Sequence, residues 1–336
     1  MLGYSPSSSV RPRNRRDQVV AACIAILWAS PGLANDSTAE LGAGGLNLVR
    51  NEEVDLLSED LRIARDAVRV TYHFRNHADH AVTYLVAFPL PAVDASTPEE
   101  ANFVLPDRGN DNFVDFTVTV DGKPVTPDID QHAFALGVDR TEVLKAHHLG
   151  LNPVADDIDD TLAKLPKDEQ LALNRLGLVL IDPDNVQAAW VLRTTFYWEQ
   201  TFPPGREIVV EHRYKPVVGN SFFGKESLVN GTYATKYCVD DAFARAARAK
   251  LDKRAGAANP YLEEDRISYV LTTANNWASP IKSFRLVVDK GDPDALVSFC
   301  GSGVKKIAPT TFEMSATDFT PERELEVLIL RKPADQ

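Results

Sequence analysis

The chain has 336 residues, of which 44% are hydrophobic and 25% charged, a composition that excludes disordered, collagen-like and low-complexity proteins. Its 36 Lys and Arg residues face 48 Asp and Glu residues, and this net charge of −12 argues against a nucleic-acid partner. Three cysteines are too few for a disulfide-dense miniprotein or a cysteine-rich zinc module.

The first segment predicts an export signal. Four arginines form a basic start, and the apolar run from Val19 to Trp28 that follows has the length of a signal-peptide core but is too short to span a bilayer. After Pro31, small residues occupy the −3 and −1 positions of a cleavage site between Ala34 and Asn35. Cleavage there leaves 302 residues with 32 basic and 47 acidic side chains, a net charge of −15. We therefore expect a periplasmic or secreted protein.

Three other interpretations of this segment stay open. The residues that end at Cys23 resemble a lipobox, although most of the apolar core follows that cysteine. Arg15 and Arg16 resemble a twin-arginine signal, although the residues after them differ from the usual ones. The third interpretation is an uncleaved anchor. No other stretch approaches the ~18 apolar residues of a membrane span, so we expect no transmembrane segment in the mature chain.

Two cysteines remain after cleavage, Cys238 and Cys300. An even pair in an exported protein predicts a disulfide, and the entropy of closing a loop of about 60 residues makes such a bond worth roughly 4 kcal/mol. Two unpaired buried cysteines are the alternative. Neither cysteine lies in a motif typical of a nucleophile, so both are expected to be structural.

Strands dominate an expected first region over residues 35–127. Apolar and polar side chains alternate strictly over 68–75, which is typical of a half-buried strand in an antiparallel sheet. The same alternation predicts strands over 82–88 and 114–120. Asp121-Gly122 then predicts a hairpin turn of type I′.

Helical spacing replaces the alternation in an expected insertion over residues 128–180, with helices over 141–149 and 162–176 and a break at Pro166. Alternation returns in a C-terminal region over 181–336, together with a helix over 241–254. The strands expected there cover 190–198, 208–214, 267–271, 284–288 and 325–329. We predict a mainly β fold of antiparallel β-sandwich modules with helical insertions.

Histidines supply one candidate metal site. His73, His77 and His80 cluster in the sequence, and neutral imidazole is a common ligand of zinc and copper. A metal there, or a pair of distant carboxylates, would allow a hydrolase of envelope polymers. The competing interpretation is that these histidines are polar residues on an exposed hairpin. No catalytic residue is assigned, and no cofactor is predicted.

Tryptophans supply one candidate ligand site. Trp190 and Trp198 alternate in phase with apolar neighbours and are expected in the core, as is His212. Trp277 lies in a turn-like segment shortly before Pro280, where an exposed ring could stack on a sugar or a peptide. A carbohydrate-binding module is therefore a further alternative.

A series of motifs runs through the whole mature chain: Asn35–Leu41 with Gly44–Leu46, Tyr72–Asn76, Phe88–Pro91, Trp198–Gly205 with His212 and Tyr214, Tyr237-Cys238, Asn276-Trp277 with Pro280-Ile281, and Phe299-Cys300. In this order they resemble a family of secreted bacterial proteins known as domain of unknown function 4424. The resemblance implies an exported bacterial protein without an assigned activity, supports the disulfide, and carries no catalytic residue over. The segment 68–120 also resembles the vault and inter-alpha-trypsin type β domain, which implies an interaction module.

The sequence thus predicts an exported, non-catalytic protein that binds another protein or a component of the cell envelope.

Overall fold

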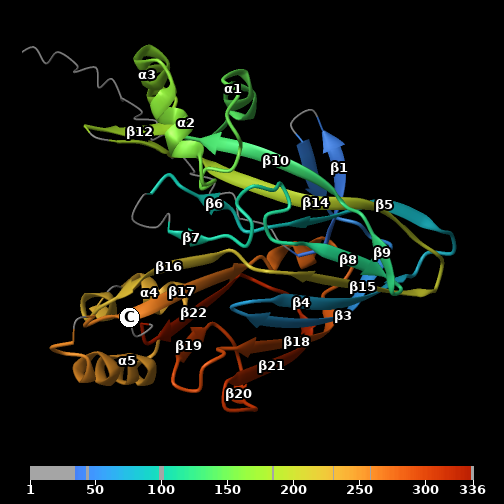
Figure 1. The fold of residues 1–336 in the computed structure, drawn as a ribbon. Helices are drawn as coiled ribbons and strands as arrows, with labels where there is room; N and C mark the ends of the chain where they lie inside the picture. Colours follow the sequence, from blue (N-terminus) through green and yellow to red (C-terminus); the bar gives the residue numbers. More distant parts are fainter. Residues whose placement is uncertain are drawn as a thin grey trace, which may run out of the picture. The chain divides into compact units, whose positions relative to one another are not determined.

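A computed structural model gives the fold of residues 35–42, 45–97, 102–183, 185–229, 231–257 and 259–333. The predicted signal segment, including Ala34, lies outside the described residues. The described chain is mostly β, as predicted, with strands in two facing layers and helices beside them (Figure 1).

Sheet A forms the first layer, in the strand order β11-β10-β14-β5-β1-β2, with β6 also paired to β14. Its centre is the antiparallel pair of β14 and β5, in which Phe196 lies opposite Phe88. Alternate residues of β14 are buried because successive side chains of a strand point to opposite faces. The bounds are β1 Ser37–Gly42, β2 Gly45–Val49, β5 Val82–Pro89, β6 Val93–Asp94, β10 Asp128–Ala135, β11 Val138–Asp139 and β14 Val191–Phe202.

Sheet B belongs to the second layer, in the order β20-β21-β18-β3-β4-β15-β8-β9. Its pairs are antiparallel except β18 with β3, which run parallel with Leu286 beside Leu61. Asp121 and Gly122 both have positive φ between β8 and β9, which confirms the predicted type I′ turn. The bounds are β3 Val54–Ala64, β4 Val68–Asn76, β8 Thr117–Val120, β9 Lys123–Val125, β15 Glu207–Tyr214, β18 Ile281–Asp289, β20 Lys305–Lys306 and β21 Thr311–Phe319.

Sheet C continues the second layer, in the order β19-β22-β17-β16-β7. Helices α4 and α5 pack against it around a separate apolar cluster that includes Leu251 and Leu328. As predicted, α5 begins at Asp241, and the Asp240 side chain accepts a hydrogen bond from the Phe243 amide. The bounds are β7 Phe103–Val104, β16 Val218–Phe223, η1 Glu226–Val229, α4 Gly231–Lys236, α5 Asp241–Lys253, β17 Leu262–Tyr269, η2 Thr272–Asn276, β19 Leu296–Phe299 and β22 Leu325–Arg331.

A helical insertion leaves sheet A after β11. It consists of α1 Thr141–Ala146, α2 Ile158–Lys164, α3 Lys167–Arg175 and the hairpin of β12 Val179–Asp182 with β13 Asn185–Ala188. Pro166 separates α2 from α3, as predicted, because a proline cannot continue a helix. The insertion has an apolar core of its own around Trp190, Leu162 and Leu173.

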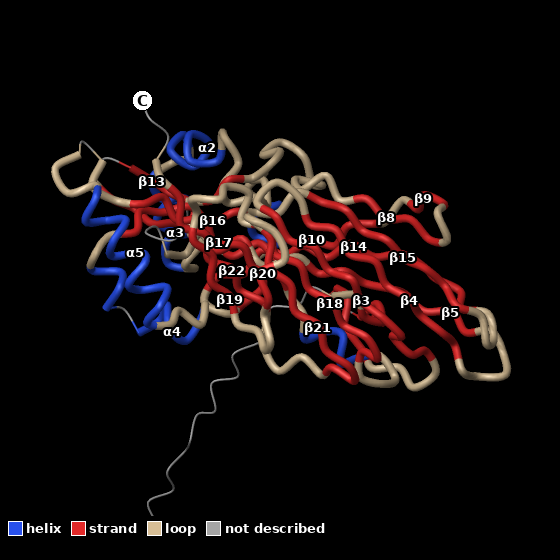
Figure 2. Tube along the Cα trace, turned by 90° about the horizontal axis from the view of Figure 1, so that it is seen from below, coloured by secondary structure: helices blue, strands red, loops and turns tan. Residues whose placement is uncertain are grey.

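The main core lies between sheet A and the layer of sheets B and C, and it draws residues from all three. Strands of the expected first and last regions alternate within sheet B, so these regions share one core and do not form separate modules. The expected insertion also begins with a strand, β10, that belongs to sheet A. Figure 2 shows α2, α4 and α5 at one end of the strands and the turn between β8 and β9 at the other.

Candidate functional site

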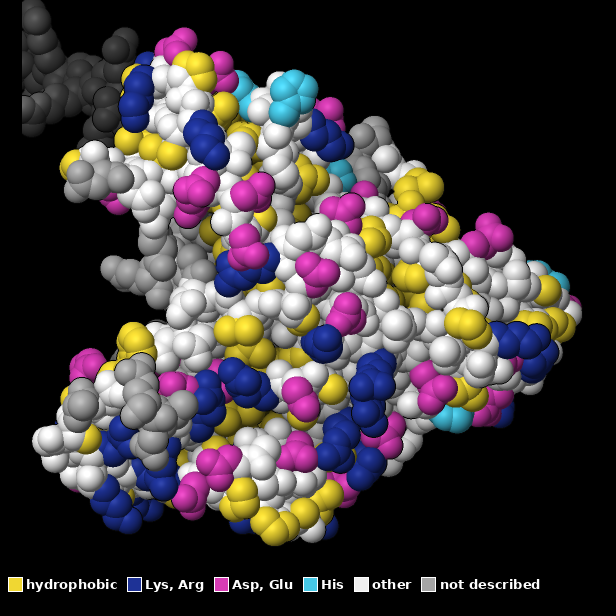
Figure 3. All heavy atoms as spheres, viewed as in Figure 1, with side chains coloured by type: hydrophobic (Ala, Val, Ile, Leu, Met, Phe, Trp, Pro, Cys, Tyr) yellow, Lys and Arg dark blue, Asp and Glu magenta, His cyan; other side chains and the backbone are white. Residues whose placement is uncertain are grey.

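A cleft of about 350 Å³ opens between the two layers, beside β17. We call it the β17 cleft. Figure 3 shows the molecule hollowed on the left of the view, between the elements of the two layers. One wall comes from α4, β16, β17 and β22, and the other from the segment around β6. The edge strand β7 of sheet C, which pairs with β16, closes one side of the cleft. The side chains that give the cleft its chemistry are Asp94, Thr97, Phe103, Val217, Lys236, Tyr237, Arg266, Ser268, Val270, Glu324 and Glu326.

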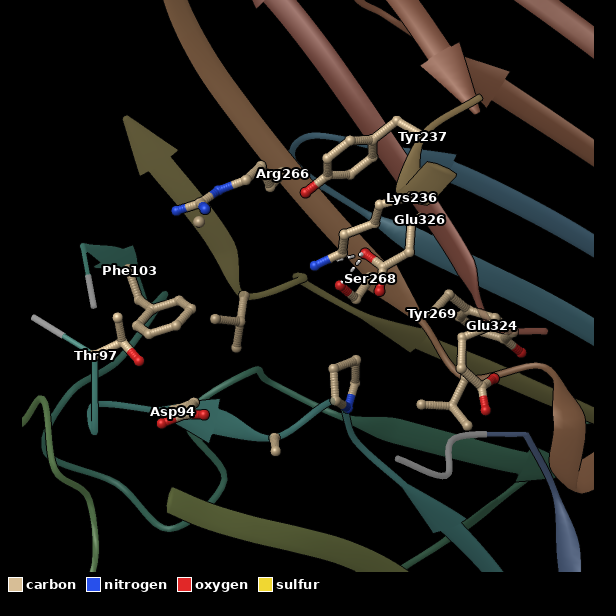
Figure 4. A pocket seen from close by; sticks show the side chains of 15 residues that line it. Asp94, Thr97, Phe103, Lys236, Tyr237, Arg266, Ser268, Tyr269, Glu324 and Glu326 are labelled. Atoms are coloured by element: carbon tan, nitrogen blue, oxygen red, sulfur yellow. Dashed lines mark hydrogen bonds and ion pairs between the residues drawn. The ribbon is translucent and has the colours of Figure 1, made fainter. Parts of the chain in front are cut away.

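The wall on sheet C carries charges of both signs. The Ser268 hydroxyl donates a hydrogen bond of 2.6 Å to Oε2 of Glu326, and Nζ of Lys236 lies 3.8 Å from the same oxygen (Figure 4). Burial raises the pKa of Glu326, and the neighbouring Lys236 ammonium lowers it by a smaller amount. Nε of Arg266 lies 3.4 Å from Oε1 of Glu264, which orients the guanidinium along this wall.

The opposite wall carries an aspartate, and the apolar ring of Phe103 on the edge strand β7 lies beside it. Figure 4 shows Asp94, Thr97 and Phe103 across the cleft from Arg266 and Lys236. One oxygen of Asp94 accepts hydrogen bonds from the Ser96 amide and hydroxyl, which fixes the carboxylate in place. The cleft can therefore offer cations on one side, an anion on the other and apolar contacts between them, an arrangement suited to binding a ligand that itself carries both charges.

The cleft shows no arrangement typical of nucleophilic catalysis in the part of the chain that the structure describes. The Ser268 hydroxyl donates to a carboxylate, and none of the described histidines lines the cleft. The carboxylate of Glu324 accepts hydrogen bonds from the amides of Leu271 and Thr272, so it holds the start of η2.

A disulfide anchors one wall of the cleft. The sulfur atoms of Cys238 and Cys300 are 2.09 Å apart, which confirms the predicted pairing. The hydroxyl of Ser298 also donates a hydrogen bond to the carbonyl oxygen of Tyr237. Together these two links fix Lys236 and Tyr237, at the end of α4, to the neighbouring strand β19.

The structure does not gather the three candidate histidines into a metal site. His73 pairs with Glu207 at 2.6 Å, His77 pairs with Asp55 at 3.1 Å, and His80 pairs with the aspartate before it at 3.1 Å. Within the described residues, no group of three or more His, Cys, Asp and Glu side chains is placed to hold a metal ion.

The expectation that Trp277 is exposed is wrong. Its side chain is 1% exposed, its ring centroid lies 4.4 Å from that of Phe74, and its indole nitrogen donates to the carbonyl oxygen of Asp36. The segment turns inward because η2 and its neighbours bond to β1, and the ring therefore cannot stack on a ligand. Trp190, Trp198 and His212 are buried, as predicted.

A second group of polar side chains lies inside the core, and sequence reasoning missed it. We call it the buried polar cluster: Asn35, Asp36, Glu59, Tyr72, His212, Tyr269 and Thr273, all at most 2% exposed. Its hydroxyl groups form a hydrogen-bonded chain. The hydroxyl oxygens of Tyr72 and Tyr269 lie 2.9 Å apart, and the Tyr72 hydroxyl donates to the side-chain oxygen of Asn35. Tyr269 also lines the β17 cleft, so the two sites are contiguous.

Two carboxyl groups of this cluster are removed from water. Oδ2 of Asp36 lies 3.4 Å from Nε2 of His212, and burial raises the pKa of Asp36 although the imidazole lowers it. Burial raises the pKa of Glu59 to about 8, and the hydrogen bond from Asn35 lowers it by less. The motif Asn35–Leu41 was visible in the sequence, but nothing local showed that its first two residues lie in the core.

The architecture defines a β-rich protein with an inter-layer cleft and a disulfide beside it. The profile of "Domain of unknown function (DUF4424)" matches residues 34–328, and the chain belongs to this family. The resemblance of residues 68–120 to the vault and inter-alpha-trypsin type domain stays a prediction.

No curated protein sequence matches the chain. A solved structure from Legionella pneumophila subsp. pneumophila str. Philadelphia 1, described as a "putative nutrient binding protein", shares 15% identity and a TM-score of 0.40, with 89% of this chain and 70% of that chain covered. At this similarity it carries no inference about what this chain binds. None of the described helices is long and apolar enough to cross a membrane.

Proposed function

We propose that this chain is an exported protein, periplasmic or secreted, that binds a protein segment or another peptide-bearing component of the cell envelope in the β17 cleft. The observation that carries the proposal is the placement of Lys236 and Arg266 opposite Asp94, with Phe103 beside them. Ammonium and guanidinium groups bind a carboxylate, a carboxylate binds an amine, and peptides supply both groups on an apolar frame.

Export is supported by the basic start and short apolar run of the first segment, and by the disulfide, since such bonds persist in oxidising compartments. Cell fractionation with mass spectrometry of the recovered protein tests this part. We expect a periplasmic or secreted chain without its first segment. A full-length chain in the cytoplasm with both cysteines reduced would contradict export.

Binding is tested by thermal unfolding of the purified protein with millimolar dipeptides, free amino acids and monosaccharides. A ligand that binds the folded state raises the melting temperature. We expect dipeptides with a free carboxylate and a basic side chain to give a rise, and we expect Arg266→Gln and Lys236→Gln to abolish it. The matched control is Arg62→Gln, which removes a half-exposed arginine of sheet B.

Absence of any rise with the wild-type protein, or an equal rise in the cleft variants, would overturn the peptide site. A rise with monosaccharides alone would instead favour the carbohydrate-binding alternative. The metal-dependent hydrolase stays a prediction that no gathered set of histidines supports.

A further inference from the structure

Asn35, the residue after the predicted cleavage site, is bound by the core through its main chain. Its backbone nitrogen lies 2.6 Å from the hydroxyl oxygen of Thr273, and the same hydroxyl lies 2.7 Å from the Asn35 carbonyl oxygen. These contacts join residues 238 positions apart in the sequence.

The side chain of Asn35 is bound as well. Its amide nitrogen donates a hydrogen bond of 3.0 Å to Oε2 of Glu59, and its oxygen accepts one from Tyr72. Every polar group of this residue thus has a partner, and the residue is fully buried. First residues of a mature chain are commonly solvated and poorly ordered unless something holds them, so this environment indicates a dedicated site.

The charges around Asn35 are unbalanced. The described part of the buried polar cluster holds two carboxyl groups, Asp36 and Glu59, and one basic group, the imidazole of His212. Among the described residues, Oδ1 of Asp36 has no hydrogen-bond partner, and Oδ2 faces Nε2 of His212 at 3.4 Å. A buried charge without a counter-charge is strongly unfavourable, so the cluster lacks one cation when both carboxyls are ionised.

We propose that hydrolysis of the Ala34–Asn35 bond completes this site, and that the new α-ammonium group of Asn35 is its missing cation. Water adds across the peptide bond, so the leaving segment takes the Ala34 carboxylate and the mature chain keeps the amine, which is protonated at neutral pH. The amine replaces an N–H that already faces Thr273. This inference rests on the proposed export.

The pKa of Glu59 supports the proposal. With an uncharged amide at Asn35, the pKa of about 8 keeps this carboxyl protonated at neutral pH. An ammonium on the residue whose side-chain amide contacts Glu59 favours the ionised form of this carboxyl, and Glu59 and Asp36 are then balanced by the ammonium and by His212. Processing would thereby add an ammonium partner for Glu59 beside the existing pair of Asp36 and His212, and stabilise the folded chain.

The first test compares chains that differ by one added residue. Residues 35–336 are prepared with a free Asn35 amine, with one alanine added before Asn35, and with one alanine added after Gln336 as the matched control. We expect the N-terminal addition to lower the melting temperature by at least about 5 °C and the C-terminal addition to leave it unchanged. We also expect the loss to shrink in the Glu59→Gln background. Equal melting temperatures for all three chains would overturn the proposal.

The second test measures the reactivity of the Asn35 amine. It uses the unaltered chain 35–336, so no variant has to fold. The free chain is treated at pH 7 with an N-hydroxysuccinimide ester of acetate, and the modified peptides are identified by mass spectrometry. We expect the Asn35 amine to react at least tenfold more slowly in the native protein than in guanidinium chloride. Equal rates would overturn the proposal.

N-terminal sequencing of the exported protein separates the two proposals. A chain that begins at Asn35 supports both. A chain that is exported but begins elsewhere overturns the ammonium site and leaves export intact. A chain that stays in the cytoplasm contradicts export and the inference that rests on it.

Discussion

Nε2 of His212 lies 3.4 Å from Oδ2 of Asp36 in a place where neither side chain is exposed. Four aromatic rings surround the imidazole, with centroids 4.8 to 5.5 Å away: Phe88, Phe116, Trp198 and Tyr72. Solvent does not screen this pair, so its two members depend on each other more than the members of a surface ion pair do.

Asp36→Asn is therefore expected to lower the free energy of unfolding by about 3 to 5 kcal/mol, since it leaves one member of a buried pair without its partner. Urea unfolding of the mature chain measures this loss. The control is Arg62→Gln, which breaks a partly exposed pair with Asp289 and should lose less than about 1 kcal/mol. The double variant Asp36→Asn/His212→Gln should lose less than the sum of the single variants. Additive losses would show that the two side chains do not interact.

Gln170 closes the turn between α2 and α3. Its side-chain nitrogen lies 3.0 to 3.1 Å from the carbonyl oxygens of Leu162, Ala163 and Leu165, at the end of α2, where the last carbonyls of a helix lack their usual partners. The Leu162 oxygen also accepts a hydrogen bond from the Leu165 amide. Gln170→Leu keeps the size but removes the donor that these oxygens share, so we expect a loss of about 2 kcal/mol by urea unfolding. Leu171→Gln, an exposed position of the same helix, is the control and should change stability by less than about 0.5 kcal/mol. An equal effect of the two changes would contradict this role.

The disulfide should contribute strongly to stability. Cys238 and Cys300 are 62 positions apart, and closing a loop of that length gives about 4 kcal/mol by the entropy of the unfolded chain. We expect the double variant Cys238→Ala/Cys300→Ala to lose about this amount, and the wild type in dithiothreitol to match it. Peptide mapping without reductant provides the check, because two unlinked thiols in the exported protein would contradict the bond.

Features set by neighbouring residues could be predicted from the sequence. The Asp121-Gly122 turn needs positive φ at both positions, and Pro166 cannot continue the helix that precedes it. The strand β3 was missed because a bulge between Leu56 and Ser58 shifts its alternation. Its parallel partner β18 comes more than 200 residues later, so no local pattern could show the pairing.

Features set by distant contacts could not be predicted. Turn-like neighbours suggested an exposed Trp277, but those neighbours bond to residues about 240 positions earlier, as Asn276 does to Ser37. Asp36 and Glu59 looked like two more acidic residues in an acidic chain. Only the fold shows that both lie in the core, with Asp36 beside a histidine that was correctly expected there. The cleft likewise depends on strands from both ends of the chain.

The pH dependence of stability should reveal Glu326 in the cleft. Burial raises its pKa in the folded state above the ordinary value of 4.5, so the folded chain binds its proton more tightly than the unfolded chain does. The stabilisation from this group is complete below about pH 4.5 and is lost as the pH rises through the folded-state pKa. Glu326→Gln cannot titrate, and its side-chain oxygen can still accept the hydrogen bond from Ser268. Relative to this variant, the free energy of unfolding of the wild type should fall as the pH rises.

Urea unfolding at pH 4, 5, 6 and 7 measures the difference between the two proteins. Glu322→Gln removes the same charge at an exposed position before β22 and serves as the matched control. A difference between wild type and Glu326→Gln that stays constant, or that grows in favour of the wild type with pH, would show that burial does not control this carboxyl. The expected decline in the stability of the wild type relative to Glu326→Gln would show that burial holds the pKa of Glu326 high. A cationic ligand in the cleft would then favour the ionised carboxylate, since a nearby cation lowers its pKa.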